Sequence, residues 1–99
     1  MPYIKQKDRE WMDSYIDNLI EGLDEARRND EGEIAKDIAG DLNYIISTLI
    51  WTLFDRTPSY TQGNSFLGVL SAVAAEFYRR KLAPYEDKKI IDNGDIERN

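Results

Sequence analysis

The residues with the clearest chemical potential are cations and tyrosines close to one another late in the sequence. They are Arg79, Arg80, Lys81, Lys88 and Lys89, beside Tyr78 and Tyr85. Arginine and lysine bind phosphate oxygens, and tyrosine rings stack on nucleotide bases. The cluster is therefore a candidate site for a small phosphate-bearing ligand. The alternative is a solvated helix end whose cations favour the helix dipole and pair with Glu86 and Asp87.

A second candidate chemistry uses the acidic residues of the first half. Glu21 with Glu25, and Glu33 with Asp37 and Asp41, recur at spacings that place each set on one face of a helix. Two such faces opposed to each other would offer oxygen ligands to Mg²⁺ or Mn²⁺, as in all-helical nucleoside triphosphate pyrophosphohydrolases. The same spacing also makes an exposed helix face soluble. We favour this second interpretation and predict no metal site.

The composition excludes several classes of chemistry. The 99 residues include no histidine and no cysteine, which rules out zinc sites of the usual nitrogen and sulfur type, Ser-His or Cys-His nucleophiles, thiol redox centres and disulfides. The net charge of -6 disfavours general DNA binding. Most of the acidity lies in residues 8–41, whose net charge is -8. We expect a protein that is not an enzyme and needs no cofactor.

The chain length and the apolar runs bound the size and the location of the protein. At 99 residues, the chain has room for a single small domain, residues 1–99. No apolar run approaches the roughly 20 residues that span a membrane, and the first residues lack the apolar core of a signal peptide. We therefore expect a cytoplasmic protein with no membrane partner.

The spacing of apolar residues predicts an all-α domain of three helices. These helices are expected over residues 8–28, 30–55 and 64–82. Gly40 falls inside the second, where a kink, a break and a close helix crossing all remain open. The residues expected to cap or stop the helices are Asp8, Asn29, the capping box of Asp30 and Glu33, then Asn64 or Ser65, and finally Pro84.

The last part of the chain suggests a folded-back segment and an assembly. Residues 83–96 begin with a proline, alternate in charge and contain an Asn-Gly turn signal, so we expect them to fold back onto the helices. The second and third helices carry apolar residues beyond one face, which would leave apolar surface exposed in a monomer. The third also has a stripe of small residues, namely Gly68, Ser71, Ala72 and Ala75. We therefore expect a homo-oligomer formed through helices two and three.

Several stretches at both ends and in the middle of the chain carry a resemblance to a known family. They are MPYIKQKDR at residues 1–9, GDLNY at 40–44, EFYRR at 76–80, PYEDKKI at 84–90 and NGD at 93–95. Together they resemble a family of small uncharacterised proteins found in bacteriophage and bacterial genomes. The resemblance implies a ligand site made of the polar and aromatic residues that a helical core does not need. These are Asn43, Tyr44, Arg79, Arg80, Tyr85, Glu86, Asp87, Lys88 and Asn93.

The resemblance also suggests a function. Small phage proteins with such surfaces include oligomeric sponges that sequester nucleotide second messengers of bacterial immunity. Our leading hypothesis is a non-enzymatic, anti-defence sponge of this kind, acting in the cytoplasm of a bacterial host if a phage encodes it. The alternatives are a helical interaction module that binds a host or phage protein, and then a metal-dependent nucleotide pyrophosphohydrolase.

Overall fold

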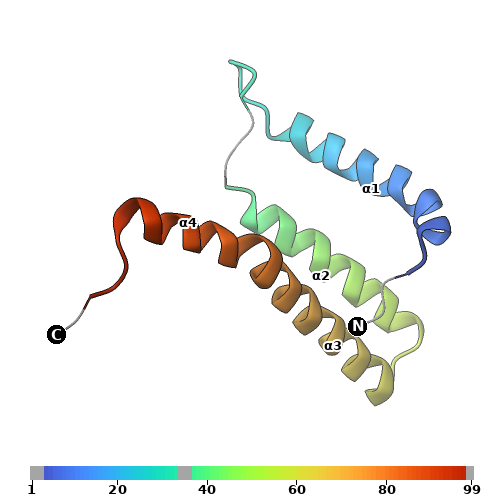
Figure 1. Ribbon diagram of the computed structural model, residues 1–99. Coiled ribbons are helices and arrows are strands. Elements are labelled where there is room, and N and C mark those ends of the chain that lie inside the picture. Colours follow the sequence, from blue (N-terminus) through green and yellow to red (C-terminus); the bar gives the residue numbers. More distant parts are fainter. Residues whose placement is uncertain (1–3, 34–36, 98–99) are drawn as a thin grey trace. The chain divides into compact units, whose positions relative to one another are not determined.

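The structure is a computed structural model that describes residues 4–33 and 37–97. These residues form the helices α1 (Gln6–Ala26), α2 (Ala39–Arg56), α3 (Tyr60–Phe77) and α4 (Ala83–Asn93), with the π-helical turn η1 (Tyr78–Leu82) between the last two (Figure 1). No strand occurs in these described ranges. Because η1 joins α3 to α4 without a break, the described residues contain three continuous helical stretches. The predicted all-α fold class is confirmed.

The chain divides into two compact units. The first comprises Met1–Thr48 and contains α1 and the first half of α2. The second comprises Leu49–Asn99 and contains the rest of α2, together with α3, η1 and α4. In the second unit, the turn of residues 57–59 joins α2 to α3, and the Thr57 backbone N–H donates to the Phe54 carbonyl at 3.1 Å.

The first helix begins two residues earlier than the sequence predicted. Lys5 has extended backbone geometry before α1, and its carbonyl accepts a hydrogen bond from the Asp8 N–H at 2.9 Å. Asp8 therefore lies in the first turn of the helix, and its expected role as the N-cap is wrong. Its carboxylate still lies where the exposed N–H groups of a helix favour negative charge.

The end of α1 also differs from the prediction. No described residue other than glycine has a positive φ, so Asn29 is not a left-handed stop. Its side-chain oxygen instead accepts hydrogen bonds from the N–H groups of Glu31 and Glu33, both at 2.9 Å. Asparagine commonly closes turns in this way, because its side chain competes with regular helix hydrogen bonding. Gly32, with φ 83°, supplies the left-handed geometry in this turn.

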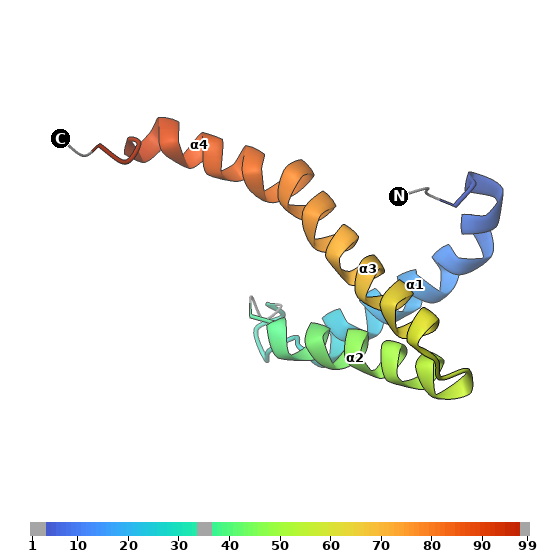
Figure 2. The same ribbon diagram turned by 90° about the horizontal axis from the view of Figure 1, so that it is seen from below.

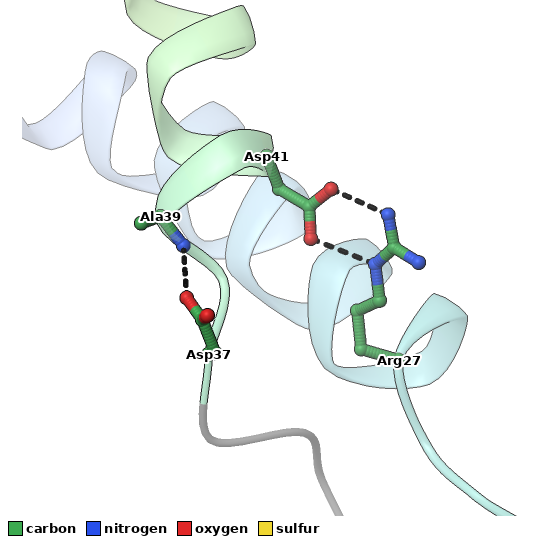
Figure 3. Close-up of polar contacts among 4 residues, drawn as sticks. All are labelled: Arg27, Asp37, Ala39 and Asp41. Atoms are coloured by element: carbon green, nitrogen blue, oxygen red, sulfur yellow. Dashed lines mark hydrogen bonds and ion pairs between the residues drawn. The ribbon is translucent and has the colours of Figure 1, made fainter.

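The second helix starts at Ala39, nine residues later than expected. The expected capping box of Asp30 and Glu33 is wrong, because both residues lie in the turn after α1. Residues 34–36 of the expected helix lie outside the described residues. The Asp37 carboxylate accepts a hydrogen bond from the Ala39 N–H at 3.2 Å (Figure 3). Gly40 does not break this helix, because it is the second residue of its first turn.

The third helix is capped by Ser59, not by Asn64 or Ser65. The Ser59 hydroxyl accepts a hydrogen bond from the Gln62 N–H at 3.0 Å, and α3 begins at Tyr60. Serine followed three residues later by glutamine is the sequence signature of a capping box. This capping pair therefore sets the start of α3, although residues 57–63 have the composition of a loop.

Pro84 does not end the helix, and the predicted fold-back of the C-terminal segment is wrong. A proline within an α-helix lacks one hydrogen-bond donor and its ring clashes with the carbonyl four residues earlier. The π-helical turn η1 widens the backbone just before Pro84, where the Ala83 N–H donates to the Tyr78 carbonyl five residues back. Therefore α4 continues from α3 as one helical stretch (Figure 2) and ends before Gly94, at φ 88° and ψ 151°.

Two glycines with different backbone geometry should respond in opposite ways to alanine substitution. Gly94→Ala is expected to destabilise the end of α4 by about 1–3 kcal/mol, since the Gly94 conformation is nearly exclusive to glycine. Gly22→Ala, in the middle of α1 with nothing close to the added methyl group, is expected to stabilise α1 by about 0.5–1 kcal/mol. Amide hydrogen exchange in the last turn of α4 and in α1 measures both effects. A stabilising Gly94→Ala would contradict the assigned helix end.

The described part of the chain has no buried hydrophobic core. No described side chain is buried, and large apolar residues are exposed on every α-helix, with Trp11 at 63% and Leu67 at 64%. No described helix combines the length and apolarity needed to cross a membrane. The apolar faces that usually make a core are therefore not buried within either unit, as far as its residues are described.

Candidate functional site

An apolar hollow lies in the second unit, between the end of α2 and α3. Its volume is about 280 Å³. Its walls are Ile50, Trp51, Phe54, Gly63, Phe66, Leu67 and Leu70. A Cβ atom on Gly63 would lie 3.5 Å from the Phe54 ring, which is an ordinary van der Waals distance, so this ring lies beside the backbone of α3. We call this hollow and its lining residues the apolar groove.

The sequence around the groove explains why it is apolar. The α3 residues of its wall follow the spacing of a single helix face, and those of α2 do the same. No charged residue occurs between Thr57 and Ala75, so α3 is uncharged on all sides up to its last turn. A helix without a charged face is usually covered by other protein. The groove can bind apolar side chains, such as those of an amphipathic helix.

A second, polar hollow lies in the first unit, where the end of α1 meets the start of α2. It has a volume of about 440 Å³ and is lined by Leu23, Ala26, Arg27, Asp41, Tyr44 and Ile45. Both Asp41 carboxylate oxygens accept hydrogen bonds from Arg27, one of them from Nε at 2.7 Å (Figure 3). This two-pronged geometry is the strongest form of ion pair between side chains. It joins the end of α1 to the start of α2 within the first unit.

The ion pair shifts the pKa of both partners. Hydrogen bonding from Arg27 lowers the pKa of Asp41, its positive charge adds to this effect, and partial desolvation opposes it. The same contact raises the pKa of Arg27, chiefly through the hydrogen bonds to Asp41. The Arg27 side chain is 50% exposed and that of Asp41 22% exposed, so solvent weakens the pair.

The Asp41 carboxyl is therefore expected to titrate below the ordinary pKa of an aspartate. Because its pKa is lower in the folded state than in the unfolded state, the ion pair stabilises the fold above the unfolded-state pKa. That stabilisation is lost as the pH falls below about 4 and through the folded-state pKa. Carboxyl-carbon NMR titration measures the value, and Arg27→Gln should return it to the ordinary range. An Asp41 pKa that does not change in Arg27→Gln would contradict the contact.

The cationic stretch on η1 and α4 is only partly engaged by local contacts. Arg79 forms an ion pair with Glu76 at 2.9 Å, and the Lys89 ammonium lies 5.5 Å from the centre of the Tyr85 ring. Among the residues that the structure describes, none forms an ion pair with Arg80, Lys81 or Lys88. The predicted pairing of the cations with Glu86 and Asp87 is therefore absent from this part of the chain.

Glu86 instead interacts with a tyrosine. The Tyr78 hydroxyl donates a hydrogen bond to the Glu86 carboxylate at 3.2 Å, which ties η1 to the first turn of α4. The negative charge of Glu86 raises the pKa of Tyr78, and the hydrogen bond adds to the shift. Tyr78 is thus a neutral donor to Glu86 and stabilises the π-helical turn.

The predicted ligand residues lie on three elements. Asn43 and Tyr44 are in the first half of α2, where Asn43 accepts a hydrogen bond from the Ser47 hydroxyl at 3.0 Å. Arg79 and Arg80 are on η1. The others are on α4, namely Tyr85, Glu86, Asp87, Lys88 and Asn93. Because neighbouring residues of a helix project about 100° apart, the four consecutive residues from Tyr85 to Lys88 point in different directions.

The proposed helical face of acidic residues does not form. Glu33 and Asp37 precede α2, so they share no helix face with Asp41, whose carboxylate is held by Arg27. Within residues 4–33 and 37–97, no three acidic side chains lie close enough to share a metal ion. The expected helix face shared by Glu33, Asp37 and Asp41 is therefore wrong.

Comparison with known proteins shows the family of the chain. A family model described as a domain of unknown function, DUF6899, matches residues 1–96. The chain belongs to this family. Neither the curated proteins nor the solved structures contained a match. The predicted membership of a small uncharacterised family is confirmed.

Two features of this DUF6899 chain escaped the sequence analysis. Asp41 was interpreted as part of an acidic face, although it forms an ion pair with Arg27. Their separation of 14 residues gives no periodic signal. The apolar groove was also missed, although Gly63 close to Phe54, Phe66 and Leu67 is a detectable hint of close helix approach.

Proposed function

We propose that this chain is a non-enzymatic interaction protein whose helices bind other polypeptide chains through their apolar faces. The observation that supports this proposal is that no described apolar side chain is buried, although the helices have the pattern of buried ones. Contiguous exposed apolar surface on a protein usually marks an interface. The protein is expected to act in the cytoplasm.

The energetics favour covered helices over isolated ones. Helices in water are marginal without packing, and most helical stability in proteins comes from burying an apolar face. Covering one large apolar side chain contributes about 1.5–3 kcal/mol. The groove alone has six such side chains besides its glycine. A partner that covers it therefore supplies stabilisation that the second unit lacks by itself.

Photo-crosslinking within cells tests the proposal. A photoreactive phenylalanine analogue replaces Leu67 in the groove, and a matched control carries it at Glu21 in α1, opposite the apolar residues. We expect a crosslinked polypeptide for the Leu67 variant and little or none for the Glu21 variant. Mass spectrometry then identifies the captured chain. No crosslink at Leu67, or equal crosslinking at both positions, would contradict the proposal.

A second candidate function is sequestration of a phosphate-bearing nucleotide by an assembly of several copies. The specific observation in its favour is that Arg80, Lys81 and Lys88 have no ion-pair partner among the described residues, while Tyr85 lies on the same helical stretch. Cations of this kind bind phosphate, and an exposed tyrosine offers a stacking surface. Because one α4 helix spreads its residues in several directions, neighbouring copies have to complete such a site.

Calorimetric titration with cyclic dinucleotides and ADP-ribose derivatives tests this second candidate. Binding is expected to be lost in Arg79→Ala and Arg80→Ala while the helical circular dichroism is kept. The ligand should be recovered intact after the protein is denatured, since sequestration breaks no bond. Turnover of the ligand would indicate an enzyme, and no binding at high micromolar concentration would exclude nucleotides as ligands.

A further inference from the structure

The last residue of α4 and the residue that follows it form a chemically labile pair. Asparagine is among the thermolabile residues of proteins. Of the asparagines in the chain, only Asn93 is followed by glycine. Asn93 is exposed to water, and Gly94 has no side chain that hinders the approach of its backbone nitrogen to the Asn93 amide. Such an approach is the first step of asparagine deamidation.

The reaction needs no catalytic residue and consumes one water molecule. The Gly94 backbone nitrogen gives its proton to a base in the solvent and attacks the side-chain carbonyl carbon, Cγ, of Asn93. A new C–N bond closes a five-membered succinimide ring. The C–N bond of the side-chain amide breaks, and its nitrogen takes up a proton and leaves as ammonia. Water then opens the ring at either carbonyl, which leaves aspartate or isoaspartate at this position.

The end of α4 holds the attacking nitrogen back. The Gly94 N–H donates a hydrogen bond to the Ile90 carbonyl at 2.8 Å, so this nitrogen keeps its proton and lies against the preceding turn. Asn93 is the last residue of the helix. Ring closure requires rotation about the Asn93 ψ until the Gly94 nitrogen eclipses Cβ, and helical backbone geometry keeps these two atoms apart. The reaction therefore requires the last turn of α4 to open.

We propose that Asn93 is a deamidation site whose rate is set by the opening of the last turn of α4. Helix ends open locally without unfolding of the whole protein. The observed rate is the rate of the open Asn-Gly pair multiplied by the fraction of time for which the turn is open. Asn93 is therefore modified slowly while α4 is complete and faster once the helix end is lost.

The product of the reaction favours the open helix end. Deamidation places a negative charge at residue 93, between Asp92 and the nearby Asp95. The unpaired carbonyls at the C-terminus of a helix disfavour a negative charge there. Isoaspartate also adds a carbon atom to the backbone, which breaks the spacing of the helix hydrogen bonds. The modification thus shortens α4 irreversibly and changes a residue of the candidate ligand set.

Two substitutions at one position test the control by the helix end. Ile91→Pro moves residue 90 out of helical geometry and so removes the hydrogen bond from Gly94 to Ile90. Ile91→Ala is the matched control, because alanine favours the helix and the Ile91 side chain is 82% exposed. In mildly alkaline buffer we expect deamidation at least about threefold faster in Ile91→Pro than in the original chain, since one backbone hydrogen bond no longer closes the end. The rate in Ile91→Ala should not change.

Peptide mass spectrometry measures the fractions of asparagine, aspartate and isoaspartate at residue 93. In water labelled with oxygen-18, both products should carry the label. Circular dichroism of Ile91→Pro checks that the other helices remain. No deamidation at residue 93 in any of the three chains would overturn the site. Equal rates in the original chain and Ile91→Pro, or equal acceleration in both variants, would overturn the control by the helix end.

A second pair of variants tests the effect of the product. Asn93→Asp carries the charge of the aspartate product, and Asn93→Gln keeps the side chain a neutral amide. We expect faster amide hydrogen exchange in the last turn of α4 in Asn93→Asp than in Asn93→Gln. Equal exchange in the two variants would overturn the proposed effect on α4. None of these substitutions changes a residue of the apolar groove, so the outcome is independent of the proposed function.

Discussion

Leu67→Glu is expected to destabilise the folded protein by about 3 kcal/mol or more and to remove its cooperative unfolding transition. In a single chain this side chain is 64% exposed, and substitutions at such positions usually change stability by no more than about 0.5 kcal/mol. In a groove covered by another helix, the same change buries an unpaired carboxylate, which is far more costly. Urea denaturation followed by circular dichroism measures the difference.

Ser65→Glu is the matched control for this substitution. Ser65 lies two positions before Leu67 on α3, so its side chain projects about 200° away and outside the groove. We expect the urea midpoint of this variant to stay close to that of the original chain. If neither variant loses stability, the groove faces water. If both variants lose the same stability, the destabilisation does not depend on the groove.

The second large effect is a dependence of stability on protein concentration. If copies of the chain cover one another's apolar faces as a dimer, tenfold dilution lowers the apparent free energy of unfolding by about 1.4 kcal/mol at 25 °C. For a dimer of two such chains, that corresponds to a fall in Tm of roughly 3–6 °C. Thermal unfolding monitored at three concentrations, each tenfold apart, measures the effect.

The reason for expecting this dependence is the absence of buried side chains in the described part of one copy. Stability in small domains comes mainly from apolar burial, which must offset the conformational entropy of the ordered chain. A Tm that does not change with concentration would contradict self-association as the source of that burial.

Local signals explain both the successes and the errors of the sequence analysis. The all-α class was predicted from the spacing of apolar residues, and this spacing does not depend on how the helices are arranged in space. The start of α3 was misplaced because the capping pair of Ser59 and Gln62 was overlooked within a loop-like composition. The end of this stretch was misplaced because Pro84 was treated as a stop, although η1 removes the steric conflict.

The candidate sites depend on side-chain contacts that local sequence patterns do not predict. Sequence singled out the cations of η1 and α4, and the structure places them on one helical stretch. It did not link Arg27 to Asp41, because an ion pair across a turn depends on the path of residues between the two helices. Nor did it separate Arg79, which is held by Glu76, from Arg80, which has no such partner among the described residues.

The sequence by itself determined the helical class, the absence of charge from α3 before Glu76 and the division into an acidic first part and a cationic stretch, since these follow from residue type and spacing. Only the tertiary structure decided that Gly63 and Phe54 shape an apolar groove, that Arg27 pairs with Asp41, and that no described side chain is buried. Burial and pairing depend on distances between residues far apart in the chain. A one-dimensional pattern contains no such distances.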